Sequence, residues 1–254
     1  MISTTIVCFN RLSYTKKTIN SYLKNTVVPH ELIIVDNNST DGTQKYLLSM
    51  LHKHKKIVRE VIFNTKNEYP GKATNQGWEK ADKKCRYLHR SDNDMIYTKG
   101  WDKEALQAFK DFPRMGQLGL TNELYQVKPE FHSQYIKKVT KGKSTLSTAM
   151  NRLGNVGGTC VIKREIWDKG IRWQEDKWDS SINEDSKFSW DVMKSGEYDI
   201  YELISGKVKH IGFGDIQQNF NYYFKSYWQR GWLNHFYERL KLEQEGKIKD
   251  HSVT

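Results

Sequence analysis

Short apolar runs alternate with longer polar segments along the first half of this chain. The runs have the length of strands, and several of the polar segments carry apolar residues at helical spacing. Residues 32–35 are continuously apolar, which is typical of a parallel strand covered on both faces. We predict strands at Thr4–Phe9, Leu32–Val35, Val58–Phe63 and Arg86–His89, and helices at Thr15–Leu23, Thr43–His52, Gly71–Ala81 and Trp101–Phe112. This alternation predicts an α/β fold with a mainly parallel central sheet, right-handed crossovers and helices on both faces.

The rhythm changes after Gly119. Residues 122–152 are polar, rich in lysine and without a clear period, so we expect either a mobile loop or disorder there. Farther along, the pattern predicts strands at Val156–Ile162, Tyr198–Leu203 and Val208–His210, a helix at Glu184–Ser195 that ends before Gly196, and an aromatic-rich helix at Asn219–Glu245. We divide the chain into residues 1–212, with halves at 1–119 and 120–212, and a C-terminal helical extension at 213–254.

Composition narrows the class of protein. An apolar share of 37% is low for a dense globule, but the 13% of aromatic residues bury large areas and compensate in part. No apolar stretch approaches the roughly 20 residues that span a bilayer, and the N-terminus lacks the basic segment of a signal peptide. Three cysteines lie far apart without a Cys-x-x-Cys, so neither a disulfide framework nor a zinc site is implied. We therefore expect a cytoplasmic protein.

The chain is strongly basic, with 41 Lys and Arg residues against 30 Asp and Glu residues and a formal net charge of +11. This balance favours an anionic partner such as a nucleotide sugar, a phosphate-rich polymer, a nucleic acid or an acidic membrane face. The charges are spread along the chain, so a solvated basic surface is the alternative interpretation.

Polar residues follow three of the predicted strands, at Phe9–Arg11, Asp36–Asn38 and Asp92–Asp94. Because ligands of parallel sheets bind beyond the carboxyl ends of the strands, we expect these three loops to converge on one crevice. Asp92 and Asp94, one residue apart, suit a hard divalent cation and the phosphates that it carries. Asp36 suits a base-edge donor such as the imide N–H of uracil, and the turn that follows it also offers caps for a helix.

The order of these motifs resembles the family 2 glycosyltransferases with a GT-A fold, over about residues 3 to 212. The resemblance rests on Thr5–Arg11, Ile33–Thr43, Gly71–Trp78, Asp92–Asp94, Gly157–Gly158 and Glu184–Asp185, of which Val35–Thr43 is the most specific part. It implies an inverting, non-processive transfer of one sugar from a nucleoside diphosphate sugar, most typically a UDP-sugar, to an acceptor hydroxyl. Residues 1–119 would then bind the nucleotide sugar, and residues 120–212 would form the acceptor and catalytic half.

The resemblance also implies roles on the donor side. Asp36 would contact the base, and Asp92 would contact the ribose or a metal-bound water. Lys72, beside Asn75 and Gly77, would steady the diphosphate or orient Asp92, with a solvated surface lysine as the alternative. The complete set of predicted donor-site residues is Phe9, Asn10, Arg11, Asp36, Asn38, Lys72, Asp92 and Asn93.

For the metal and the catalytic base, the resemblance implies a second set of residues. Mn²⁺ or Mg²⁺ would bind Asp94, Asp92 and His210, although a lone histidine is commonly a structural residue. Asp185 would take the proton of the acceptor hydroxyl, and an ordinary acidic first turn of a helix is the alternative. Glu184, Asp176 and Asp179 are the other candidates for the base.

The acceptor stays open at this stage. A cell-surface glycan or its lipid-linked precursor is the usual acceptor in the resembled family. The basic Lys128–Arg152 segment and the aromatic C-terminal helix also allow a hydroxymethylated base in DNA, and a non-catalytic basic binding module is the alternative from another class. The chain departs from the family at His89 and Arg90, where the strand is usually apolar, and we expect these residues to place extra polar groups in the donor site.

Overall fold

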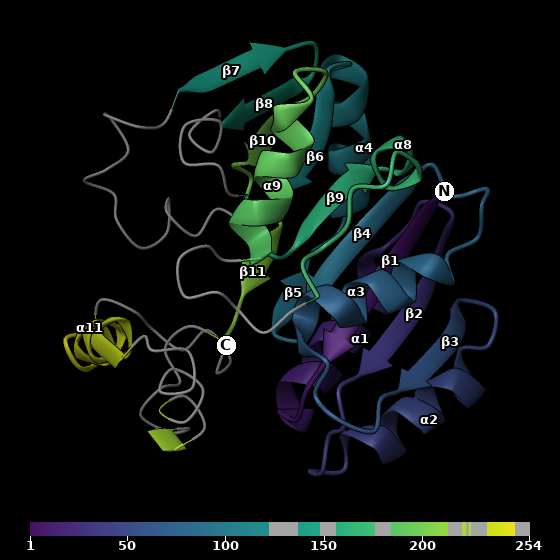
Figure 1. Cartoon of the computed structure of the whole chain (residues 1–254), viewed down its shortest axis with the longest axis vertical. Helices are drawn as coiled ribbons and strands as arrows, with labels where there is room; N and C mark the ends of the chain where they lie inside the picture. Colours follow the sequence, from purple (N-terminus) through teal and green to yellow (C-terminus); the bar gives the residue numbers. More distant parts are fainter. Residues whose placement is uncertain are drawn as a thin grey trace.

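A computed structural model describes residues 1–121, 137–147, 156–175, 184–212, 220–221, 224 and 233–246. In this part of the chain, a nine-stranded sheet with the order β3-β2-β1-β4-β9-β6-β10-β8-β7 forms the centre of the molecule (Figure 1). A second, two-stranded sheet pairs β11 with β5.

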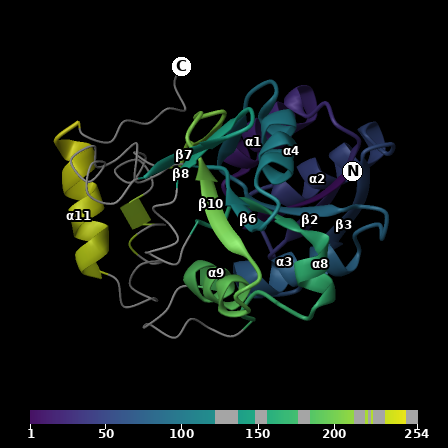
Figure 2. The same ribbon diagram turned by 90° about the horizontal axis from the view of Figure 1, so that it is seen from above.

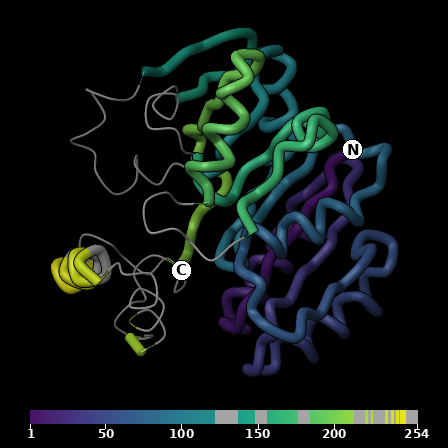
Figure 3. The backbone as a smooth tube through the Cα atoms, viewed as in Figure 1, coloured from purple at the N-terminus to yellow at the C-terminus, as the bar shows by residue number. Residues whose placement is uncertain are grey.

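The first half of the sheet is parallel, as the sequence predicts. It consists of β1 (Ile2–Cys8), β2 (His30–Asp36), β3 (Val58–Phe63) and β4 (Tyr87–Asp92), with β1 pairing with β2 and β4. Residues 32–35 are fully buried, which confirms a strand covered on both faces. Because these strands run in parallel and in register, the carboxyl ends of β1, β2 and β4 lie at one edge of the sheet (Figure 3).

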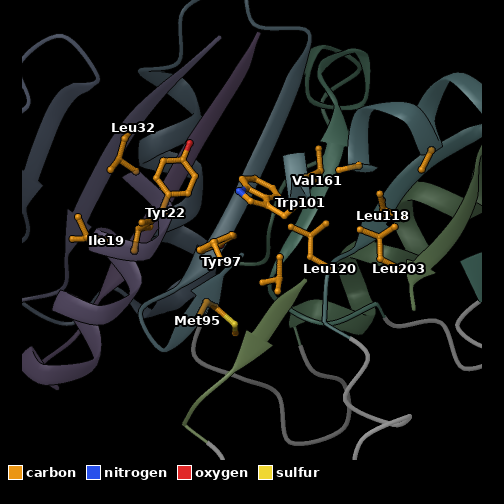
Figure 4. Packing of buried hydrophobic residues seen from close by; sticks show 14 of the residues in the cluster. Ile19, Tyr22, Leu32, Met95, Tyr97, Trp101, Leu118, Leu120, Val161 and Leu203 are labelled. Atoms are coloured by element: carbon orange, nitrogen blue, oxygen red, sulfur yellow. The ribbon is translucent and has the colours of Figure 1, made fainter. Parts of the chain in front are cut away.

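Helices cover both faces of the sheet (Figure 2). One hydrophobic cluster packs α1 (Leu12–Asn25), α2 (Thr43–Lys53) and α4 (Trp101–Asp111) against one face. A second cluster packs α3 (Tyr69–Glu79), α8 (Arg164–Asp168) and α9 (Glu184–Lys194) against the other. Fully buried Tyr22, Trp101 and Leu32 illustrate the first cluster (Figure 4).

The helices predicted in the first half of the chain and at Glu184–Ser195 are confirmed, with some ends shifted. The helix predicted from Thr15 begins at Leu12, because Asp41 Oδ2 accepts the N–H of Leu12 at 2.8 Å. Asp41 Oδ1 also accepts the N–H of Thr43 at 3.1 Å, so one carboxylate serves the first turns of α1 and α2. Gly196, with φ +70°, follows the end of α9 as the sequence predicts.

The second half of the sheet is mixed. β9 (Cys160–Lys163) runs antiparallel to β4 and to β6 (Met115–Gly119), while β10 (Asp199–Leu203) is parallel to β6. The strand predicted over Val156–Ile162 is wrong at its start, because the backbone turns at Gly157, where φ is +78°. Strand β6 was not predicted, since two glycines and Gln117 interrupt its apolar pattern.

A β-hairpin lies within the segment for which we expected a loop or disorder. β7 (Lys138–Lys141) pairs with β8 (Ser144–Ser147), and Asp111 Oδ2 holds the turn by accepting the N–H of Lys143 at 2.9 Å. The expectation is therefore wrong for residues 138–147. Apart from Lys137, the rest of residues 122–152 lies outside the described part of the chain. β7 is an exposed edge strand, where lysines protect a sheet against further pairing.

The two-stranded sheet brings residues 208–210 next to the turn that carries Asp94. β5 (Met95–Tyr97) follows directly after Asp94, and β11 (Val208–His210) pairs with it so that His210 lies opposite Met95. Of the predicted Asn219–Glu245 helix, the structure describes α11 (Leu233–Gln244) and helical residues at 220, 221 and 224. Among the described residues, none of the helices has the length and apolar character to span a membrane.

Candidate active site

The three loops at the carboxyl edge of the sheet are tied to one another, as predicted. The N–H of Asn10 donates to Ser39 Oγ at 2.7 Å, and Asn10 Oδ1 accepts the N–H of Thr40 at 2.8 Å. Asn93 Nδ2 donates to the carbonyl of Asn10 at 3.1 Å. Asn10, Arg11 and Asn38 have positive φ angles, a conformation that commonly marks functional loops. The loops after β1, β2 and β4 therefore form one unit.

Asp36 lies inside the turn that follows β2. Its Oδ2 accepts hydrogen bonds from the N–H of Ser39 and from Gln44 Nε2, both at 2.9 Å. The side chain is fully buried, and its Oδ1 has no hydrogen-bond partner among the described residues. Asp36 therefore stabilises the turn, and the predicted capping of the next helix comes from Asp41. Contact with a base stays a prediction, for which Oδ1 is the remaining acceptor.

Asp94, Arg11 and His210 meet at the edge of the crevice, and we call these three residues the Asp94 cluster. Asp94 Oδ2 lies 2.7 Å from Arg11 Nη1 and 3.0 Å from His210 Nε2. Burial by itself raises the pKa of Asp94, but the His210 and Arg11 side chains outweigh burial and hold that pKa well below its usual range. Asp94 is therefore an anion at neutral pH.

The backbone around the Asp94 cluster leaves no space for larger residues. A Cβ on Gly212 would lie 2.1 Å from Asp94 Oδ2 and 2.8 Å from Arg11 Nη2. The N–H of Ile211 donates to the carbonyl of Asp94 at 2.8 Å, which fixes the chain after β11 against the turn that carries Asp94. The pairing of β11 with β5 thus determines where His210 stands.

The residues of this edge fit a divalent cation in part. Among the described residues, no three His, Cys, Asp or Glu side chains form a ready-made metal cage. Asp92 as a further ligand beside Asp94 and His210 stays a prediction. Asp94 Oδ1 is buried without a hydrogen-bond partner among the described residues, beside an imidazole. Mg²⁺ is usually held by one or two carboxylates, with substrate phosphates and waters completing its shell. Asp94 and His210 fit such a site.

Lys72 and its neighbours on α3 have partners at the start of α3, on β1 and in the 171–175 segment. Lys72 Nζ pairs with Glu68 Oε2 at 2.9 Å, and no described contact joins it to Asp92. Asn75 is buried and holds the 171–175 segment, with Nδ2 donating to the carbonyl of Trp173 at 2.9 Å. Gly77 packs α3 against β1, since a Cβ there would lie 2.4 Å from Thr5. Asn75 and Gly77 are therefore packing residues, and a role of Lys72 toward the diphosphate stays a prediction.

The acidic pair at the start of α9 reaches the end of β4. Glu184 Oε1 lies 3.1 Å from Arg90 Nη2, and Asp185 Oδ1 lies 3.2 Å from Arg90 Nη1. Arg90 Nη2 also lies 3.7 Å from Asp92 Oδ1. We call these four residues the Arg90 cluster. The Glu184 side chain is 5% exposed and that of Asp185 is 23% exposed, so Asp185 is the more accessible acid. Asp176 and Asp179 lie outside the described residues.

The expectation for His89 is wrong, and that for Arg90 is incomplete. Side chains alternate between the faces of a strand, so His89 points away from Arg90 and Asp92. His89 is fully buried in the core, where it bonds Thr4 Oγ1 at 3.1 Å and Tyr97 Oη at 3.2 Å. Burial lowers the pKa of His89 to about 3, which keeps the ring neutral. Because successive side chains of a strand point to opposite faces, the sequence itself could have placed His89 and Arg90 on opposite faces of β4.

Comparison with known proteins shows the family of the chain. The model of the family described as glycosyl transferase family 2 matches residues 3–170, more than half of the chain. The chain therefore belongs to glycosyl transferase family 2. It is 29% identical over 183 residues to an uncharacterized glycosyltransferase of Rickettsia felis, a match that covers 69% of this chain and 29% of the relative.

Solved structures show the same fold. S. aureus TarS in complex with UDP-GlcNAc superimposes with a TM-score of 0.59 at 20% identity, covering 82% of this chain and 57% of the TarS chain. GalNAc-T7 with UDP, GalNAc and Mn²⁺ superimposes with a TM-score of 0.61 at 16% identity, covering 83% of this chain and 43% of the other. The predicted GT-A fold is thus confirmed. The chain spans less than two thirds of the length of each of these proteins.

Proposed function

We propose that this protein transfers a single sugar from a nucleoside diphosphate sugar to an acceptor hydroxyl, with inversion at the anomeric carbon. The observation that carries the proposal is the Arg90 cluster, in which one guanidinium contacts both the acidic pair of α9 and Asp92 at the end of β4. The candidate base and the candidate donor-binding carboxylate therefore lie against the same guanidinium.

The donor that we propose first is a UDP-sugar. Family membership supports a sugar donor, and the solved TarS and GalNAc-T7 complexes contain UDP-GlcNAc and UDP, respectively. The loops that would receive the nucleotide follow β1 and β2, and Asp36 Oδ1 is the buried acceptor proposed for the base. Arg11, one of the three residues of the Asp94 cluster, would contribute positive charge toward the diphosphate.

We propose that Asp94 and His210 hold a divalent cation, Mn²⁺ or Mg²⁺. When bound, this ion supplies positive charge that offsets the charge developing on the leaving diphosphate. The Mn²⁺ in the GalNAc-T7 complex supports a metal-dependent site in a protein of the same fold. Arg11 already pairs with Asp94 Oδ2, which leaves Oδ1 as the oxygen for the ion.

Asp185 is the proposed general base. It takes the proton of the acceptor hydroxyl while the acceptor oxygen forms a bond to the anomeric carbon. The bond from that carbon to the diphosphate breaks on the opposite face, and the diphosphate leaves with the electron pair. Asp185 suits this step better than Glu184 because it is the more exposed of the two acids. Its place in the first turn of α9 favours the ionised form that a base requires.

A donor screen tests the proposed function. UDP- and GDP-sugars are incubated with the full chain and either Mn²⁺ or Mg²⁺, with water as the acceptor, and the free nucleoside diphosphate is measured. We expect slow hydrolysis of at least one donor, stimulated by metal and abolished by a chelator. The proposal would be contradicted if the chain neither bound nor hydrolysed any of the donors with either metal. Candidate glycan and lipid-linked acceptors are then added to the active donor.

A further inference from the structure

Arg90 is buried beside three carboxyl side chains, which together can carry more negative charge than its guanidinium carries positive charge. Its side chain is 2% exposed. One Nη atom lies 3.2 Å from Asp185, and the other lies 3.1 Å from Glu184 and 3.7 Å from Asp92. A guanidinium presents its donors in a rigid planar fork, so it fixes two carboxylates at once, whereas an ammonium acts as a single point of charge.

Aromatic and backbone contacts hold the guanidinium from other sides. The Arg90 Cζ atom lies 4.2 Å from the centroid of the Trp173 ring, and that ring stacks on Phe188 of α9 with centroids 4.0 Å apart. Asn75 Oδ1 accepts the N–H of Trp173 at 3.1 Å, which anchors the stacked ring to α3. A Cβ on Gly158 would lie 3.0 Å from Arg90 Nη2 and 3.0 Å from Asp92 Oδ2. The position of the guanidinium is therefore set by three separate parts of the chain.

Two adjacent acids at the start of one helix repel each other when both are ionised. Arg90 compensates their charge and holds each in a defined place, because a different Nη atom bonds each acid. The Nη2 atom that bonds Glu184 also faces Asp92. Asp92 lies two residues after Arg90 and therefore on the same face of β4. Arg90 thus links the acids of α9 to the donor-binding end of β4.

We propose that Arg90 is a positioning residue for sugar transfer: its guanidinium sets the place of Asp185 relative to the donor-side Asp92. This inference rests on the proposed function, and it adds a residue for which the family resemblance provides no counterpart. Arg90 itself does not touch the reacting atoms. Its effect passes through Asp185, so the loss of its fork geometry should slow the chemical step more than it weakens donor binding.

The test compares Arg90→Lys and Arg90→Gln with the parent chain. Lysine keeps the positive charge but not the fork. We expect Arg90→Lys to retain a near-parent melting temperature and a UDP dissociation constant close to the parent value by calorimetry. Its kcat for hydrolysis of the donor found in the screen should fall by about tenfold to a hundredfold, since misplacement by about 1 Å can cost a hundredfold. Arg90→Gln should lose more.

Arg59→Lys is the matched control, since Arg59 also pairs with two carboxylates, Glu31 and Asp82, but on the surface and away from the crevice. It should leave kcat at the parent value. If the role of Arg90 were purely structural, Arg90→Lys would keep both the melting temperature and kcat near the parent values. Parent-like kcat in folded Arg90→Lys would therefore overturn the proposal, as would a loss confined to UDP binding.

A readout without activity separates this inference from the proposed function. Hydrogen–deuterium exchange at residues 187–191, the first amides of α9 that donate within the helix, reports whether the first turn of α9 is held by the fork. We expect faster exchange there in Arg90→Lys than in the parent chain or in Arg59→Lys, and unchanged exchange would overturn the positioning role. Failure of the parent chain to turn over any donor would count against the proposed function alone.

Discussion

At the scale of single residues, two histidines of this chain lie in different surroundings, and we propose different roles for them. His210 stands in the Asp94 cluster at the edge of the crevice, 3.0 Å from a carboxylate oxygen. His89 lies in the core among Tyr22, Tyr97 and Trp101, where it is hydrogen-bonded through both ring nitrogens. The residue type alone does not distinguish a site histidine from a structural one. The partners on neighbouring elements do.

The buried His89 makes stability depend on pH. Its pKa is about 3 in the folded protein and about 6.5 in the unfolded chain. The unfolded chain therefore binds a proton first, so the stabilising contribution is present above about pH 6.5 and is lost as pH falls toward 3, at about 1.4 kcal/mol per pH unit. Urea unfolding from pH 7 to pH 4 should show a flatter acid dependence in His89→Gln than in the parent chain. An equal slope in both proteins would contradict this assignment.

We expect the metal dependence of donor hydrolysis to require the carboxylate of Asp94. Asp94→Asn keeps the shape but removes the anion, leaving Arg11 and His210 beside a neutral amide. We expect metal-stimulated donor hydrolysis to fall at least about a hundredfold, because a bound cation supplies several kcal/mol of charge stabilisation. Mn²⁺ binding, followed by electron paramagnetic resonance, should weaken in parallel. Asp82→Asn, a surface control, should change neither. Full activity of Asp94→Asn in the presence of a chelator would refute the metal assignment.

At the scale of elements, short strands and tight glycine contacts assemble the crevice. The pairing of β11 with β5 brings His210 across more than a hundred residues of sequence to Asp94. Gly212 allows this approach, just as Gly77 allows α3 to pack on β1. The two glycines serve the same steric purpose at different places, one in the crevice and one in the core.

Replacing each of these two glycines by alanine should therefore affect different properties, activity in one case and stability in the other. Gly212→Ala places a Cβ 2.1 Å from Asp94 Oδ2, so we expect donor hydrolysis and Mn²⁺ binding to fall while the melting temperature changes little. Gly77→Ala places a Cβ 2.4 Å from Thr5, and overpacking there should cost about 1–3 kcal/mol of stability. Thermal unfolding and donor hydrolysis of both variants provide the comparison. Equal activity of Gly212→Ala and the parent chain would refute the role given to this contact.

At the scale of the whole molecule, the sequence predicts the parallel half of the fold better than the mixed half. Parallel strands such as β2 are buried on both faces and read as continuous apolar runs. Strand β6, with Gly116, Gln117 and Gly119, does not show this pattern, because it depends on pairing with β9 and β10, which are distant in sequence. The lysine-rich β7 does not show it either, because it is an exposed edge strand. Edge strands are also selected for charge, which hides them from hydrophobic patterning.

The candidate site follows the same division. The convergence of three loops could be predicted, because the carboxyl ends of parallel strands share an edge. The meeting of Asp94 with His210 could be predicted only from family resemblance. The role of Arg90 could not, since it depends on how α9, Trp173 and β4 pack together in three dimensions.

The rate of donor turnover by Asp185→Asn tests the central claim most directly. Asparagine keeps the shape and can still accept a hydrogen bond from Arg90, but it cannot take up the acceptor proton. Asp191→Asn, on the same helix and paired with Lys187, is the control. We predict unchanged UDP binding, a near-parent melting temperature and turnover reduced at least about a hundredfold for Asp185→Asn, since general-base loss usually costs 10² to 10⁴ in rate. Turnover by Asp185→Asn at the parent rate would contradict the account.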